Sequence, residues 1–386
     1  LPAFLHVEWP RFLGRRLDST VSAARIPEEP DWSGGNGMKN LKKMLPVLGV
    51  CLLTMVCIEL VYSGMHINAY RGGDISKDTV WPWLTYDPIM GWVNRSGYVM
   101  EGRFRIDNNG LRIIESSPGT DGQKRLIVCM GDSGTFGIWG GTPDKFGGLK
   151  FDSFPQRLQN LVADRGDVII NAGTIGYSSA NLLRQYAFLI RQMKPQIIVV
   201  RVGHNDHMPS WDKRLAVQPP HNAALRYLYQ HFPSSLTVQT IAHYRYMLGH
   251  KTTGTVWSTP GQYEDNLRTL IRTANEDGSK VILVDYPVRP PGIPPAASKE
   301  KFAEHLSVIM GVKSYAEYVA LHEKYMQRME AVAQSTGTPV VRTKYRLEDP
   351  QENAYSAWDQ MHPNKHGMDI VAEEIAKVLR KDPVVQ

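Results

Sequence analysis

One stretch constrains the fold of this chain most, because an apolar run ends abruptly in glycine and a serine follows two residues later. Residues 125–130 have the length and composition of a buried strand, and Gly131, Gly134 and Gly137 allow a sharp turn at its end. Ser133 lies in this turn. Ligands collect at the carboxyl ends of parallel strands in open α/β folds. The stretch therefore predicts a serine at such an edge.

Three known motifs match this turn only in part. A phosphate-binding loop requires a lysine that does not follow Gly137, and the G-x-S-x-G elbow requires a glycine where Thr135 stands. Chymotrypsin-like proteases share Gly-Asp-Ser, but their histidine and aspartate precede the serine, whereas most of the globular chain follows Ser133 here. Alone, the string does not identify a function.

Composition excludes several classes of protein. With 386 residues, of which 42% are hydrophobic, the chain can bury a large core. Its net charge of +6 is modest and its basic residues are scattered, so we predict no nucleic-acid partner. Cys51 and Cys57 lie in an apolar N-terminal segment, which leaves Cys129 alone in the globular part. No Cys/His cluster has the sequence spacing of a zinc site, and we predict neither metal nor cofactor.

The N-terminal region has the pattern of an export signal or membrane anchor. Residues 1–37 are polar and irregular, and we hypothesise that they form an extension upstream of a biological start at Met38. Three lysines at 39, 42 and 43 precede an apolar run over residues 44–62, which is about long enough to cross a bilayer. We interpret residues 38–65 as a transmembrane or signal segment.

The orientation and processing of this segment follow from its flanks. The lysines precede the apolar run, which predicts that the C-terminal body lies outside the cytoplasm. Val61-Tyr62-Ser63 is a poor cleavage site, which favours a retained anchor over a cleaved signal peptide. We therefore expect a membrane-anchored, extracytoplasmic protein, or a secreted or periplasmic one if the segment is cleaved.

The rest of the chain predicts an α/β domain behind a small lead-in. Residues 66–120 form a β-rich lead-in, with short strands at 98–100 and 104–106 and a turn at 108–110. From residue 121 to 386, helix and strand patterns alternate, which is typical of a parallel sheet covered by helices on both faces. The proline-rich residues 207–262 interrupt this rhythm and are interpreted as an insertion over the sheet edge. Expected strands are 168–170, 196–202, 281–284 and 339–341, and expected helices are 154–165, 179–191, 263–274, 315–334 and 365–380.

Four polar blocks follow predicted strands or open the last helix. They are Gly131-Asp132-Ser133, the segment 171–178, Gly203-His204-Asn205-Asp206, and Asp359-Gln360-Met361-His362-Pro363. Each is weak alone, but their occurrence in order indicates acyl transfer.

Each block supplies a role in that chemistry. A serine needs a base to take its proton, which His362 can do, and Asp359 can orient the imidazole. The tetrahedral intermediate needs hydrogen-bond donors, which the Gly173 N–H, the Asn205 amide and the Ser133 N–H can supply.

These residues resemble the SGNH (GDSL-type) hydrolase family. Ser133, Gly173, Asn205 and His362 match its four defining positions, and Asp359 matches its D-x-x-H-P block. The resemblance covers residues 121–386 and implies a flavodoxin-like three-layer α/β/α fold and carboxyl-ester hydrolysis. His204 stands where smaller residues are common, and the insertion falls where the family varies most.

We therefore predict an exported serine esterase, with an O-acetyl ester on a cell-surface glycan as the expected substrate. Two alternatives stay open at this stage. An acyltransferase would use the same residues with a sugar hydroxyl in place of water. A catalytically silent binding protein would keep the fold, although an intact Ser133, Asp359 and His362 argue against it. Acyl length, acceptor and oligomeric state do not follow from the sequence.

Overall fold

Five strands form the central sheet in the order β6-β5-β7-β8-β9, and every neighbouring pair is parallel. Counted along the chain, this is the order 2-1-3-4-5 of doubly wound folds. The strands are β5 (Arg125–Gly131), β6 (Asp167–Gly173), β7 (Ile197–Arg201), β8 (Lys280–Val284) and β9 (Val340–Val341). The α/β class and the parallel sheet expected from the sequence are confirmed.

The computed structural model describes part of the chain, and the account below is limited to that part. The described residues are 36–64, 81–87, 90–115, 125–140, 148–208, 228, 235–241, 258–289, 312–356 and 361–381. The predicted extension 1–37 lies almost entirely outside them. So does most of the predicted insertion 207–262, of which residues 236–241 are helical.

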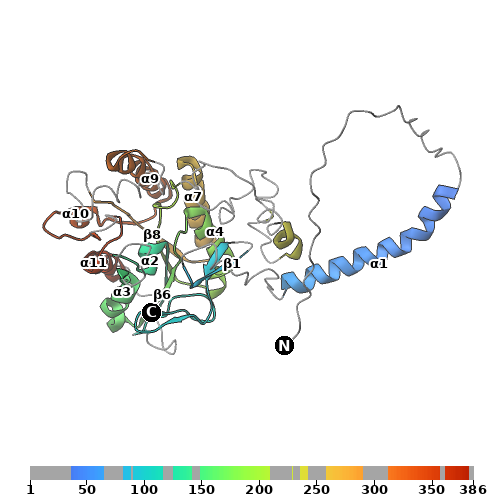
Figure 1. Cartoon of the computed structure of the whole chain (residues 1–386), viewed down its shortest axis with the longest axis horizontal. Coiled ribbons are helices and arrows are strands. Elements are labelled where there is room, and N and C mark those ends of the chain that lie inside the picture. The colour runs from blue at the N-terminus through green and yellow to red at the C-terminus, as the bar shows by residue number, and fades with distance from the viewer. Residues whose placement is uncertain are drawn as a thin grey trace, which may run out of the picture. The chain divides into compact units, whose positions relative to one another are not determined.

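Helices cover both faces of the sheet. On one face lie α4 (Ser179–Phe188), α7 (Pro260–Glu276) and α9 (Tyr315–Thr336), and on the other α3 (Phe154–Val162) and α11 (Lys365–Lys381) (Figure 1). Successive side chains of a strand point to opposite faces. Val128 and Met130 of β5 accordingly join the first layer, and Ile127 and Cys129 join the second.

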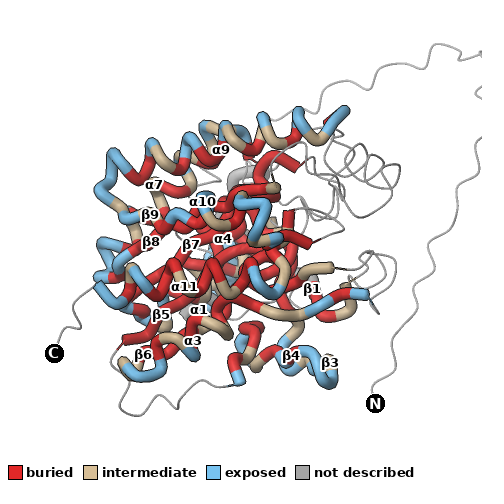
Figure 2. Tube along the Cα trace, turned by 90° about the vertical axis from the view of Figure 1, so that its left-hand side faces the viewer, coloured by how far each residue is buried: buried red, intermediate tan, exposed pale blue. Residues whose placement is uncertain are grey.

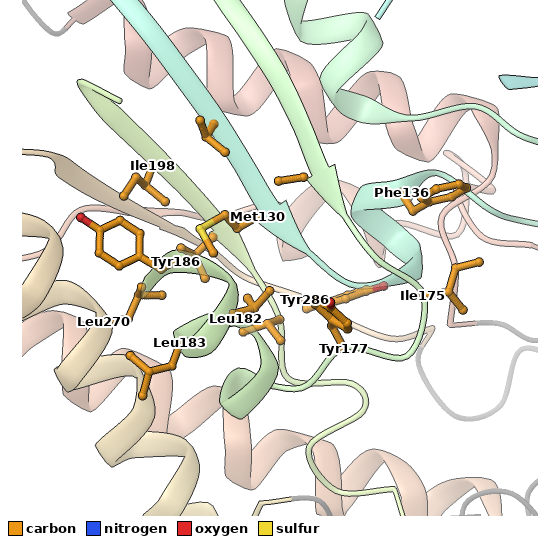
Figure 3. Close-up of a cluster of buried hydrophobic side chains, with 14 of the residues drawn as sticks. Met130, Phe136, Ile175, Tyr177, Leu182, Leu183, Tyr186, Ile198, Leu270 and Tyr286 are labelled. Atoms are coloured by element: carbon orange, nitrogen blue, oxygen red, sulfur yellow. The ribbon is translucent and has the colours of Figure 1, made fainter. Parts of the chain in front are cut away.

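The two cores enclose a deeply buried sheet. In Figure 2 the strands are buried along their length, whereas the helices carry an exposed outer face. Figure 3 shows the α4 side of this packing, where Met130 and Ile198 of the sheet face Leu182 of α4 and Leu270 of α7. The described residues also form short elements: α2 (Ser133–Phe136), α10 (Lys344–Leu347) and the 3-10 turns η2 (Ala163–Arg165) and η3 (Ile190–Met193).

The helix starts follow local capping rules. The Ser314 hydroxyl accepts a hydrogen bond from the Glu317 N–H at the start of α9 (3.1 Å). Thr259 and Gln262 form a capping box at the start of α7, with Pro260 at its first position. Two expected helices are shorter than predicted. The segment 154–165 is α3 to Val162 and then η2, and the segment 179–191 is α4 to Phe188 and then η3, which ends at Lys194 in a left-handed conformation (φ 50°).

Within its described residues, the lead-in contains two small antiparallel pairs. The predicted pair is β3 (Val99–Met100) with β4 (Phe104–Arg105), and the pair β1 (Leu84–Asp87) with β2 (Gly91–Asn94) was not predicted. Trp83 before β1 is fully buried, with ring centroids 5.3 Å from Phe104 and 6.3 Å from Phe136 of α2. These aromatic contacts join the lead-in to the core next to α2, which packs on the edge strand β6.

The N-terminal apolar segment is the helix α1 (Asn36–Gly64). The side chains described, those of residues 45–61, include many exposed apolar groups; Leu53 and Leu60 are 65% and 66% exposed. Among the helices that the structure describes, none combines the length and the apolar character that a membrane span requires.

Candidate active site

Ser133 is placed by the abrupt end of β5. The strand stops at Gly131, and Ser133 is the first residue of α2. A Cβ at Gly131 would lie 2.0 Å from Thr135 Oγ1 and 2.4 Å from the Arg201 carbonyl oxygen, and a Cβ at Gly134 would lie 2.1 Å from Tyr286 Oη. Only glycine fits at both positions. The tight turn leaves Ser133 partly exposed at the carboxyl edge of the sheet.

His362 meets this serine from the other end of the chain. Its Nε2 lies 2.7 Å from Ser133 Oγ. The His362 carbonyl accepts a hydrogen bond from the Ser356 N–H (2.8 Å), and Tyr355 pairs with Pro363, which fixes the segment just before α11. A serine hydroxyl within hydrogen-bond distance of an imidazole is the geometry of an activated nucleophile.

The third member of the predicted triad, Asp359, lies outside the described residues, as do residues 357, 358 and 360. Its role in orienting His362 therefore stays a prediction.

Asp132 organises the turn around Ser133. Its side chain caps α2 by accepting the Gly134 N–H (2.9 Å). The Tyr286 hydroxyl donates to the same oxygen (3.0 Å), and the Asn205 amide nitrogen lies 3.3 Å from the other. Burial raises the pKa of Asp132, while these donors and the Arg201 charge favour the carboxylate. The carboxylate thus ties the nucleophile turn to the segments after β7 and β8.

Arg201 and Tyr286 belong to this site, and the sequence reasoning did not single them out. Arg201, the last residue of β7, is fully buried with its guanidinium carbon 3.6 Å from the centroid of the Tyr286 ring. Within the described part of the chain, its Nε, Nη1 and Nη2 have no hydrogen-bond partner. The contact is a buried cation–π interaction. The sequence does contain a signal that could have identified Arg201, because it is a charged residue within a mostly apolar predicted strand.

Asn205 is buried in the turn after β7, close to Ser133. Its amide nitrogen donates to the Tyr177 carbonyl (2.9 Å) besides contacting Asp132. These two contacts hold the amide beside the nucleophile turn. These contacts also occupy the N–H donors of the Asn205 amide in this structure. To stabilise an oxyanion, the amide must therefore give up one of these hydrogen bonds.

Gly173 lies at the end of β6, next to Gly131 in the sheet register. Its N–H donates to the Asn171 side chain (2.9 Å), so the predicted oxyanion donor already has an acceptor within the chain. A Cβ there would lie 2.2 Å from the Phe136 nitrogen, so the glycine allows α2 to pack directly on β6. Gly176, in the same loop, has φ +78°, and a Cβ there would lie 3.2 Å from the Trp92 ring, so glycine suits both the backbone conformation and the packing.

The lead-in strands hold this loop in place. The Trp92 indole donates to the Ile175 carbonyl (2.7 Å), and the Tyr177 hydroxyl donates to the Trp92 carbonyl (2.7 Å). The Asn94 amide donates to the Gly173 carbonyl (3.1 Å). The conformation of the loop after β6 therefore depends on residues that lie 79 to 85 positions earlier in the chain.

His204 lies close to His362. Its ring stacks on Tyr286 with centroids 4.9 Å apart, and its centroid lies 6.3 Å from that of His362. Burial lowers the pKa of His204 well below its ordinary value, so the ring is neutral near pH 7.

A known protein family matches the part of the chain that contains this site. Residues 129–370 match the model of the GDSL-like Lipase/Acylhydrolase family, a span that contains Ser133, Gly173, Asn205 and His362. No curated protein matches the chain.

Several solved structures are similar to the chain. A mutant of an acetyl-xylooligosaccharide esterase from Geobacillus stearothermophilus is 18% identical, covers 66% of this chain and 94% of its own, and has a TM-score of 0.39. A carbohydrate acetylesterase from Sinorhizobium meliloti is 14% identical, with 67% and 99% covered and a TM-score of 0.43. A GDSL-like lipase from Bacteroides thetaiotaomicron is 15% identical, with 69% and 92% covered and a TM-score of 0.39.

Proposed function

Because the chain belongs to the GDSL-like lipase/acylhydrolase family, whose members are carboxylic ester hydrolases, we propose that Ser133 and His362 hydrolyse an ester through an acyl-enzyme intermediate. The observation that carries this proposal is the 2.7 Å contact between Ser133 Oγ and His362 Nε2. Both side chains are partly exposed, so a substrate can reach them.

The reaction proceeds in two steps. Ser133 Oγ attacks the ester carbonyl as its proton passes to His362 Nε2, and the imidazolium then gives that proton to the leaving alcohol. In the second step His362 takes a proton from water, whose oxygen attacks the acyl-enzyme, and returns it to Ser133. Asp359 orients the ring and stabilises its charged form. The Asn205 amide, the Ser133 N–H and a glycine N–H of the loop 173–176 stabilise the negative oxygen.

We further propose that the substrate is a short-chain ester, an O-acetyl group on a glycan at the cell surface. The family's chemistry and the N-terminal apolar helix support this choice. For the full chain in detergent, we expect hydrolysis of p-nitrophenyl acetate to exceed that of the octanoate by at least about tenfold in kcat/KM, since an extended acyl chain needs an apolar channel. Acetate release from acetylated polysaccharide then tests the glycan. A clear preference for long chains would contradict the acetyl assignment, and acetyl transfer to an added glycan would favour the acyltransferase.

No described helix meets the requirements of a membrane span, and we propose instead that the N-terminal apolar segment 38–65 directs export and places the catalytic domain outside the cytoplasm. The exposed apolar side chains of residues 45–61 support contact with a membrane during export, and the preceding lysines support this orientation. A phosphatase reporter active only outside the cytoplasm, fused after Gly64, should be active, and a reporter that works only in the cytoplasm should be silent there. Exchanging Lys39, Lys42 and Lys43 for glutamine should weaken this difference. The opposite reporter pattern would refute the proposed localisation.

A further inference from the structure

Three buried histidines meet beside the candidate active site, and the proposed reaction does not use them. His204 and His207 follow β7, whereas His322 comes from the middle of α9. Their exposed fractions are 2%, 1% and 1%, and one ring nitrogen of each lies within 4.8 Å of the others. We propose that these imidazoles form a structural binding site for a divalent transition metal of the zinc class.

The orientation of His322 suits a metal ligand. Its Nε2 lies 2.5 Å from the Tyr286 carbonyl oxygen, which can only accept a hydrogen bond. Nε2 therefore carries the proton, and Nδ1 presents a lone pair toward His207 Nε2 at 3.0 Å. Metal-binding histidines commonly donate their second N–H to a carbonyl in this way, which fixes the tautomer and the ring orientation.

His207 offers its second ring nitrogen, Nδ1, to the site. With His322 Nδ1 as the acceptor, His207 Nε2 carries the ring proton and Nδ1 carries a lone pair. Within the described residues, this Nδ1 has no hydrogen-bond partner, which is unusual for a buried polar atom. A bound ion leaves His207 two ways to bind. The ring either binds the ion through Nδ1, or it binds through Nε2 and carries its proton on Nδ1.

The distances are close to those of a zinc site. Zinc–nitrogen bonds of about 2.0–2.1 Å place tetrahedral ligand nitrogens roughly 3.4 Å apart. The facing nitrogens of His207 and His322 already lie near this separation. Since the three ligand nitrogens lie within 4.8 Å of one another, a small rotation of the His204 ring brings its nitrogen to the same separation. The Tyr318 hydroxyl, 2.9 Å from His204 Nε2, or a water molecule can supply the fourth ligand.

The environment keeps the three rings in the form that binds metals. Burial lowers the pKa of all three, that of His322 to about 4, so each imidazole is neutral at pH 7. The negative charge of Glu323 favours a positive charge at His322, whereas the positive charges of Arg201 and Lys344 oppose it. The affinity must therefore come from the nitrogen ligands themselves.

A cavity beside His322 provides a route of entry. It has a volume of about 400 Å³ and lies between α9, α10 and the end of β8. Its described walls carry four carboxylates and one ammonium group, Lys344, which pairs with two of them, and Arg342 pairs with a third. These carboxylates belong to Asp285, Glu323, Glu330 and Glu348.

A metal at this place would connect α9 to the turn that carries Asn205, which the proposed chemistry uses. His204 and His207 flank Asn205 in one turn, and His322 belongs to a helix packed on the sheet. Binding would therefore hold the Asn205 turn against α9 and raise the melting temperature, since a ligand that binds only the folded state stabilises it.

Metal uptake by the full chain tests the proposal. The protein, prepared in detergent without a polyhistidine tag, is stripped with chelator and given Zn²⁺ or Co²⁺. We expect one bound equivalent after desalting, a visible spectrum of tetrahedral Co²⁺ and a higher Tm with Zn²⁺. His207→Gln keeps an N–H donor for His322 but loses the ligand, and it should bind Zn²⁺ at least about 100-fold more weakly. His366→Ala removes an exposed histidine outside the cluster and should bind metal normally.

Two results would overturn the site. One is an unchanged spectrum and Tm in the unsubstituted protein after metal addition. The other is full stoichiometric binding by His207→Gln. If His207→Gln does not fold, His204→Gln replaces it, with the Tm without metal as the check of folding. Ester hydrolysis measured on the same samples keeps this outcome separate from the proposed function, because the reaction at Ser133 has no step that uses the metal.

Discussion

Ser133→Ala should lower kcat for p-nitrophenyl acetate by roughly 10⁴-fold or more, because the proposed acyl-enzyme forms on the Ser133 hydroxyl. The substitution removes one partly exposed hydroxyl at the start of α2, so the Tm should change little. The unsubstituted protein should also be labelled by a fluorophosphonate probe, and Ser133→Ala should not.

Ser335→Ala provides a matched control. Ser335 lies on α9, where its hydroxyl contacts Arg268 (2.6 Å) and backbone carbonyls of its own helix. This variant should keep full turnover and full labelling. Equal turnover by Ser133→Ala and the unsubstituted protein would remove Ser133 from the mechanism, and a parent protein that neither turns over esters nor reacts with the probe would favour a silent binding protein.

His362→Ala should be nearly as damaging as Ser133→Ala, because the serine loses the base 2.7 Å away. Groups that act as one unit give non-additive losses, so the double variant Ser133→Ala/His362→Ala should be little worse than either alone. Asp359→Ala should retain roughly 10- to 100-fold more activity than His362→Ala, since the aspartate orients and stabilises the imidazole without transferring a proton.

The measurement is kcat and KM for one activated ester across these variants, with His366→Ala as the control. His366 is an exposed histidine paired with Glu352, so its loss should leave kcat unchanged. Full multiplicative losses in the double variant would mean that Ser133 and His362 act independently. An Asp359→Ala variant as inactive as His362→Ala would show that the aspartate does more than orient the ring.

Local sequence patterns predicted the architecture well. Continuous apolar runs such as 196–202 predict buried parallel strands, and β7 forms within that range because such side chains are covered on both faces. The long helices α7, α9 and α11 are close to their predicted ranges because their apolar periodicity and caps are local. The strands β1 and β2 were missed, since each has only four residues and depends on pairing with the other.

By itself, the sequence determined the end of β5 and therefore the position of Ser133 in the turn after it, because turn glycines act through their nearest neighbours, and it singled out His362 by the polar block before the last helix. The roles of other groups depended on the tertiary structure. Gly173 donates to Asn171 instead of pointing an unpaired N–H at the substrate, and Arg201 lies on Tyr286, a residue from another strand end. His322 joins His207 across 115 residues, and no spacing rule predicts such a contact. Periodicity fixes which residues form a strand or helix, but only packing decides which side chains meet.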